Sequence, residues 1–172
     1  MSLIQVLGAA DLESNDWVER ILTLDRLNMA QVLRESGRDF PELRRRSVLR
    51  DPSLVVIALV NREELVGYID FCDDQRNRMD VYLTSIQLVS RYRHGLSIAK
   101  LLAPAARILK KRSFRYLRAD VQRSNVAALT LCSRLGFRTR ERADSPTSWD
   151  VIGDRTLLES DFVTRVMDRV SY

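Results

Sequence analysis

The spacing of apolar residues changes twice in the middle of the chain, and this change limits the possible folds more than any other feature. Residues Met79–Val89 (MDVYLTSIQLV) have the β-branched and aromatic content of a strand. Arg115–Val121 (RYLRADV) again alternates as a strand does. Between them the apolar residues follow the spacing of an amphipathic helix: Ile98, Leu101, Leu102, Ala105, Ile108 and Leu109. A strand–helix–strand crossover of this kind makes its two strands parallel.

The other segments favour antiparallel pairing. Leu54–Val60 and Leu65–Cys72 are apolar runs separated by a tight turn, and a second short turn leads to Met79. Further strands are expected at Ser2–Leu7, Phe137–Arg142 and Thr147–Ile152, and further helices from Asn15, over Pro41–Val48 and over Asn125–Leu135. We therefore predict an α/β fold with a mixed, mostly antiparallel sheet and one parallel β-α-β crossover.

The length favours one domain. A chain of 172 residues, 45% of them hydrophobic, is expected to form a single domain over residues 1–172, with a C-terminal helix at about 160–170 as an extension. No apolar run approaches the length of a membrane span, and the first residues do not resemble a signal peptide. Cys72 and Cys132 have no metal-ligand spacing, so we expect reduced thiols, no metal and a cytoplasmic location.

The charge leaves two interpretations open. The net charge is +5, and 25 of the 28 basic residues are arginine. The densest cluster consists of Arg44, Arg45, Arg46 and Arg50, with Arg38 nearby, and it fits either a solvated helix face or a surface for an anionic partner. The surrounding segment offers only Phe40 for stacking on bases, which argues against nucleic acid.

The junction between the predicted strand and helix has the features of an anion site. Gly95, Ser97 and Ala99 are small, so an anion can approach the backbone, and Arg91, Arg93 and His94 lie beside them. The first amides of a helix lack intrahelical acceptors and carry the positive end of the helix dipole. Small residues also begin many helices that bind nothing, so this segment alone leaves both interpretations open.

A second motif follows after one strand. At the sequence NVAALTLCSRLGF the chain resembles the GNAT superfamily of acyl-CoA-dependent N-acyltransferases. His94, Ser97 and Ala99 occupy the positions of that family's cofactor loop. The family's later pattern is matched at Asn125, Ala128, Leu131, Cys132, Gly136 and Phe137. The resemblance is strong over Met79–Phe137, about a third of the chain, and the order of elements extends it to nearly the whole chain.

The resemblance implies a cofactor, acetyl-CoA or another acyl-CoA, held where two strands splay apart. Backbone groups of Leu88 and Val89 would then contact the pantetheine and the acyl carbonyl. The amides of Leu96, Ser97, Ile98 and Ala99, with His94, Gly95 and Asn125, would complete the cofactor site. The implied reaction is transfer of an acetyl or other short acyl group to a primary amine by direct attack in a ternary complex.

Arg91 stands where the family often has a Pro, and three further residues depart from the family pattern. His94 replaces an Arg or Gln, and Ser97 replaces a Gly. Cys132 stands where many members have a Tyr that protonates the departing thiolate. A thiol can in principle serve as that acid. Cys132 also lies on the apolar face of its predicted helix, where a free Cys is often a small hydrophobic residue.

The proton acceptor is less defined. Asp80, Tyr82 and Thr84 alternate along one face of their predicted strand, and we name Asp80 and Tyr82 as candidates. Asp120 and Asp150 are further carboxylates on later strands. The alternative function is a non-catalytic GNAT-fold module that binds CoA or a protein. The acceptor is expected to be a small-molecule or protein amine, the chain is compatible with a homodimer, and no motif identifies either partner.

Overall fold

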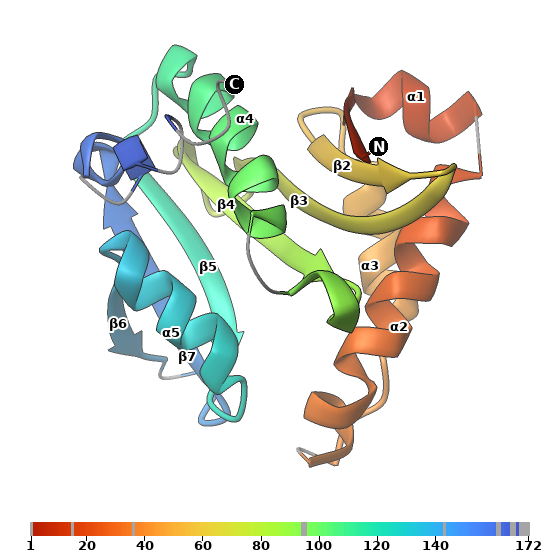
Figure 1. The fold of residues 1–172 in the computed structure, drawn as a ribbon. Coiled ribbons are helices and arrows are strands. Elements are labelled where there is room, and N and C mark those ends of the chain that lie inside the picture. Colours follow the sequence, from red (N-terminus) through yellow and green to blue (C-terminus); the bar gives the residue numbers. More distant parts are fainter. Residues whose placement is uncertain are drawn as a thin grey trace.

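A computed structural model of the protein describes residues 2–14, 16–35, 37–93, 96–142, 144–160, 163–165 and 168. Within these residues a seven-stranded sheet has the order β1-β2-β3-β4-β5-β7-β6 (Figure 1). Its strands are β1 (Ser2–Leu7), β2 (Val55–Asn61), β3 (Glu64–Asp74), β4 (Asn77–Leu88), β5 (Tyr116–Gln122), β6 (Arg138–Glu141) and β7 (Ser148–Asp154). The helices are α1 (Ala9–Ser14), α2 (Trp17–Glu35), α3 (Glu42–Leu49), α4 (Ser97–Lys111) and α5 (Val126–Leu135), with 3-10 turns η1 (Ser90–Tyr92) and η2 (Arg155–Glu159).

The pairing confirms the predicted fold class. The β4–β5 pair is parallel and is joined by α4, whereas the other strand pairs are antiparallel. Arg62 and Glu63 connect β2 to β3 with positive φ angles of 48° and 69°. Such a two-residue turn matches the twist of the flanking strands and makes a tight hairpin.

The sheet separates two hydrophobic cores. Side chains of β2 alternate between them: Ile57 and Leu59 face α4, whereas Val56 and Ala58 face α1, α2 and α3. The apolar run of β2 is therefore continuous because both of its faces are buried. Figure 1 shows α4 and α5 in front of the sheet and α2 and α3 beside and behind β2 to β4. We call these two sides the α4 face and the α2 face.

Several local features differ from the sequence predictions. Helix α1 and the turn η2 were not expected, and Asn15, the predicted cap of the next helix, lies outside the described residues. Residues 163–165 and 168 are helical, and the Ser160 hydroxyl accepts a hydrogen bond from the Val163 amide at 3.4 Å. The other residues that we assigned to this last helix, Val166, Met167 and Val170, lie outside the described part.

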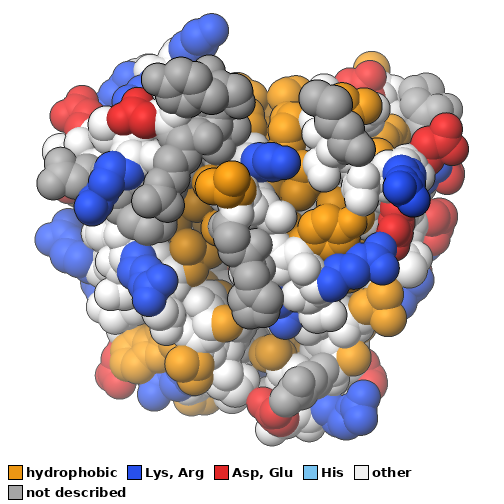
Figure 2. All heavy atoms as spheres, in the orientation of Figure 1, with side chains coloured by type: hydrophobic (Ala, Val, Ile, Leu, Met, Phe, Trp, Pro, Cys, Tyr) orange, Lys and Arg blue, Asp and Glu red, His pale blue; other side chains and the backbone are white. Residues whose placement is uncertain are grey.

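The arginine cluster on α3 does not form one solvated face. Arg44 and Arg50 are exposed, but only 10% of the Arg45 side chain is exposed. Its guanidinium contacts Asp25 Oδ2 of α2 at 2.8 Å and Asp70 Oδ2 of β3 at 2.5 Å. Figure 2 shows basic side chains dispersed among acidic ones around the visible face rather than gathered in one patch.

Candidate functional site

The parallel strands β4 and β5 stay together over a short distance only. The register records two pairs, Val81 with Leu117 and Tyr82 with Arg118, preceded by a 2.7 Å hydrogen bond from the Arg115 amide to the Met79 carbonyl. Beyond these pairs the two strands diverge (Figure 1). The result is a wedge between the end of β4 and the end of β5, with its apex at the Tyr82–Arg118 pair.

A bulge in β4 lies at the apex of this wedge. Asp70 of β3 pairs with Ser85 and Phe71 pairs with Leu83, so Thr84 is the extra residue. Because of the bulge, Leu83 and Ile86 both pack against the α4-face core. Thr84 is instead turned to the α2 face, where its hydroxyl donates to Asp70 Oδ1 at 2.5 Å.

Helix α4 begins without a side-chain cap. Its N-cap residue is Leu96, which makes no capping hydrogen bond, and its first turn contains no acidic residue. Leucine is a poor N-cap, so the first amides of α4 are not satisfied by a side chain there. Helix α5 differs, because Asn125 Oδ1 accepts from the Ala128 amide at 3.2 Å. The start of α4 thus keeps the properties of an anion site.

Side-chain burial limits how the start of α4 can contact a ligand. Ala99 is buried and Ile98 packs against the α4-face core, so these two residues can offer a ligand their backbone amides only. The Ser97 side chain is half-buried and the Leu96 side chain is exposed. His94 and Gly95, which were also predicted to bind the cofactor, lie outside the described residues.

Backbone groups at the end of β4 already form hydrogen bonds inside the protein. The Val89 amide donates to the Val66 carbonyl at 2.9 Å. The Leu88 carbonyl accepts from Asn28 Nδ2 at 3.0 Å and from Arg93 Nε at 3.1 Å. The predicted contacts of Leu88 and Val89 with a cofactor would therefore use other backbone groups, and the edge of β4 between the bulge and Leu88 is the nearer candidate.

Tyr82 and Asp120 lie near each other on the α2 face of the wedge. Burial, followed by the Asp120 carboxylate, raises the pKa of Tyr82 well above its ordinary value. Arg76 lies over the Tyr82 ring, 5.3 Å from its centroid. Asp120 pairs through Oδ2 with Arg142, and its buried Oδ1 makes no hydrogen bond of normal length among the described residues, so it can still accept one from Tyr82 or from a substrate. The sequence does not single out Asp120, because one acidic residue on a strand carries no specific signal.

Asp80 has a different environment from Tyr82. Its side chain is fully buried, and Oδ2 contacts Arg118 Nε at 3.0 Å. Asp80 precedes the two β4–β5 pairs, so it lies on the closed side of the apex. This position suits a residue that orients Arg118 better than one that meets a substrate.

Cys132 is part of the α4-face core. It is 5% exposed, and burial raises the pKa of its thiol to about 11. This environment favours the packing interpretation, and a catalytic role for Cys132 stays a prediction.

A buried polar network on the α2 face was not expected from the sequence. Asp25, Arg45, Tyr68 and Asp70 come from three separate elements, and the Tyr68 hydroxyl donates to Asp25 Oδ1. Burial raises the pKa of Asp25, an effect that Arg45 and Tyr68 oppose. One signal was present: Asp70 interrupts an otherwise apolar strand sequence, LVGYIDFC.

Two other kinds of site find no support in the described part of the chain. No group of three or more His, Cys, Asp or Glu side chains there has the arrangement of a metal site. The helices within the described ranges are also too short or too polar to cross a bilayer.

Residues 18–137 match the model of the acetyltransferase (GNAT) family, and the chain therefore belongs to this family. The match covers the wedge, the start of α4 and the whole of α5. It agrees with the resemblance seen in the two sequence motifs. No curated protein sequence matches the chain significantly.

Solved structures show the same fold. The PaiA N-acetyltransferase from Thermoplasma acidophilum, crystallised with coenzyme A, aligns with a TM-score of 0.63 at 17% identity over 90% of this chain and 99% of its own. An acetyltransferase from Thermus thermophilus gives 0.63 at 18% identity, covering 90% and 97%. An aminoglycoside 6'-acetyltransferase type Ii gives 0.66 at 16% identity, covering 89% and 97%.

Proposed function

We propose that this acetyltransferase-family protein transfers an acetyl or other short acyl group from acyl-CoA to a primary amine, by direct attack in a ternary complex. The observation that carries the proposal is the uncapped start of α4 beside a wedge with a bulge at its apex. A pyrophosphate can bind the start of α4, and an extended pantetheine can pair with the edge of β4 in the wedge. We place the protein in the cytoplasm and treat residues 1–172 as one domain.

The residues present fit the cofactor. The amides of Leu96, Ser97, Ile98 and Ala99 would bind the pyrophosphate, with His94, Gly95 and Asn125 as further members of the site. Acyl-CoA supplies a thioester whose carbonyl carbon is open to attack by an amine. Backbone donors at the β4 bulge are suited to hold the thioester carbonyl oxygen, because fixed amides stabilise developing negative charge.

We assign the proton chemistry to the α2 face of the apex. The Asp120 carboxylate accepts the proton of the amine, which becomes far more acidic as the nitrogen bonds to the acyl carbon. Tyr82 keeps its own proton because its pKa is raised, so we assign it the role of orienting Asp120 by a hydrogen bond. Asp80 serves as a positioning residue through Arg118. The thiolate of CoA takes its proton from water.

The test combines binding and turnover. Calorimetry with acetyl-CoA should show binding, and free thiol should appear when acetyl-CoA is mixed with a panel containing a diamine, an amino sugar and a lysine peptide. Leu96→Asp should cap α4 and raise the stability of this helix. It should also weaken acetyl-CoA binding at least tenfold, because the new carboxylate would occupy the helix start in place of the pyrophosphate. Leu43→Asp, at the exposed start of α3, is the matched control. Unchanged binding by Leu96→Asp would refute the assigned pyrophosphate site.

One observation favours a second candidate, a module that binds CoA without catalysis. Cys132 replaces the family's proton-donating Tyr and is buried in the core. This alternative predicts acetyl-CoA binding with no thiol release above hydrolysis for any amine in the panel. Asp120→Asn separates the two: under our proposal it keeps acetyl-CoA binding and loses most turnover.

A further inference from the structure

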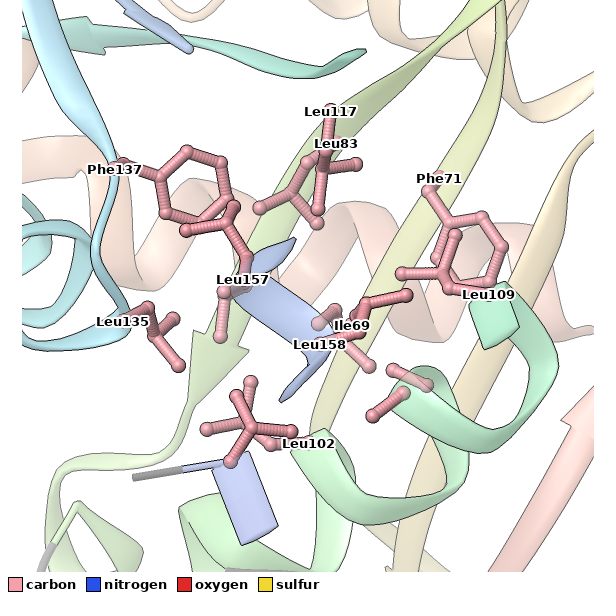
Figure 3. A pocket seen from close by; sticks show the side chains of 14 residues that line it. Ile69, Phe71, Leu83, Leu102, Leu109, Leu117, Leu135, Phe137, Leu157 and Leu158 are labelled. Atoms are coloured by element: carbon pink, nitrogen blue, oxygen red, sulfur yellow. The ribbon is translucent and has the colours of Figure 1, made fainter. Parts of the chain in front are cut away.

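An apolar cavity of about 50 Å³ lies between α4 and the sheet. Figure 3 shows side chains from β3, β4, α4, β5 and η2 pointing into one space. Its lining includes Leu83, Ile86, Leu102, Ala106, Leu117 and Leu157. All of the lining side chains are hydrocarbon, so the cavity offers nothing that would bind an ordered water.

The cavity lies beside the apex of the wedge. Leu117 belongs to one of the two β4–β5 pairs, and Leu83 is the first β4 residue beyond those pairs. Both side chains line the cavity, as does Ile86, which the bulge turns to the α4 face. A group held at the apex is therefore next to the cavity on the α4 face and next to Tyr82 and Asp120 on the α2 face.

These two faces have opposite chemistry. The α2 face presents a phenol and a carboxylate, which suit an amine and its proton. On the α4 face the cavity is lined by hydrocarbon only, which suits the tail of an acyl group. A cavity must provide roughly 10–15 Å³ for each water-sized group, so about 50 Å³ admits about three to five groups of that width. An acetyl methyl at the apex would leave this space empty.

We propose that the cavity receives the distal carbons of the acyl chain, so that the preferred donor is a butyryl- to hexanoyl-CoA rather than acetyl-CoA. This inference rests on the proposed function and names its donor class. In the transfer the acyl carbon–sulfur bond breaks and the acyl carbon–nitrogen bond forms. The amine proton goes to Asp120 and the CoA thiolate takes a proton from water.

Calorimetric titration with acetyl-, butyryl-, hexanoyl- and octanoyl-CoA tests the inference without any acceptor. Each buried methylene strengthens binding about fourfold, so butyryl-CoA, with two more methylenes, should bind roughly fifteenfold more tightly than acetyl-CoA. The gain should level off by octanoyl-CoA. Equal dissociation constants for acetyl- and butyryl-CoA, or a continued gain at octanoyl-CoA, would overturn the assignment to this cavity.

Two variants with opposite expected effects connect the preference to the cavity. Ala106→Leu fills part of it and should remove the advantage of butyryl- and hexanoyl-CoA while leaving acetyl-CoA binding unchanged. Leu102→Ala enlarges it and should move the optimum to a longer chain. If one variant does not fold, the other still tests whether the cavity sets the chain-length preference. The control is Ala127→Leu, the same alanine-to-leucine substitution at an exposed position of α5, which should have no effect.

The outcomes separate the two proposals. A graded affinity without thiol release for any amine would support the cavity and refute the proposed catalysis. A second outcome would refute the acyl pocket and leave the proposed catalysis intact. In that case thiol release is fastest with acetyl-CoA, all four acyl-CoAs bind with equal affinity, and each variant changes the binding of every chain length equally.

Discussion

Replacing Arg45 on α3 by methionine should destabilise the protein strongly. Arg45 contacts two carboxylates that are almost completely buried, with side-chain exposures of 3% for Asp25 and 0% for Asp70. Removing one partner of a buried ion pair costs about 3–5 kcal/mol, because the remaining charge loses its compensation. Methionine retains much of the apolar stem, so the loss reports the charge rather than the packing.

The pH dependence of this loss has a definite sign. Burial already raises the pKa of Asp25, and Arg45 opposes that effect, so the variant should raise the pKa further. A carboxyl whose pKa is higher in the folded state than in the unfolded state contributes stability below its unfolded pKa. That contribution is lost as the pH rises through the folded pKa. The deficit of Arg45→Met should therefore be smaller at pH 5 than at pH 8.

Urea denaturation at both pH values measures the deficit. The expected loss corresponds to a decrease in Tm of roughly 6–20 °C for a chain of this size. Arg44→Met is the control, since this neighbouring arginine is exposed and its replacement should change stability by less than about 0.5 kcal/mol. A loss below about 1 kcal/mol at pH 8, or a deficit that grows toward pH 5, would show that Arg45 does not compensate the two buried carboxylates.

Three further predictions follow from local contacts. Gly67→Ala should destabilise the protein by about 1–3 kcal/mol in urea denaturation. The reason is that a Cβ there would lie 2.4 Å from Leu88 Cδ2 and 2.8 Å from a backbone oxygen. An unchanged stability would show that the end of β4 can move away from this Cβ at no cost. Burial raises the pKa of Cys132 to about 11 and of Cys72 to about 12. In the folded protein at pH 8 both thiols should therefore react with a disulfide reagent at least about 100-fold more slowly than in the protein unfolded by urea. Rapid labelling of the folded protein would contradict their burial. Asn125→Ala should cost about 0.5–2 kcal/mol by removing the cap of α5, measured by Tm against Asn125→Ser, which can still cap.

The sheet and its crossover could be predicted because their signals are periodic and local. Strand β2 has a continuous apolar sequence since both of its faces are buried, and α4 has a clear apolar stripe. The six-residue helix α1 is too short to show a periodicity, and η2 has no repeating pattern to detect. Short elements of this kind are fixed by what they pack against rather than by their own sequence.

The candidate site was predictable only in part. The start of α4 was found because small residues and a helix onset coincide in the sequence. The β4 bulge was not, because Thr84 differs in no visible way from its neighbours until its pairing with β3 is known. Arg45 likewise lies within a run of arginines, and nothing in that run distinguishes the one that is buried between two carboxylates.

The short contact between β4 and β5 divides the sheet into two parts, which we call leaves: β1 to β4 form one and β5 to β7 form the other. Within the described residues, the two leaves are joined only along the β4–β5 pairs, which we call the seam. Beyond Tyr82 and Arg118, the leaves are held by side chains of the α4-face core, which contains residues from both of them, and not by backbone hydrogen bonds. Amides along the facing edges should therefore exchange with solvent faster than those on the outer edges of the same strands. Fluctuation in the angle between the leaves should also decline when an extended ligand bridges them, so amide exchange at this seam would report how far the two leaves open.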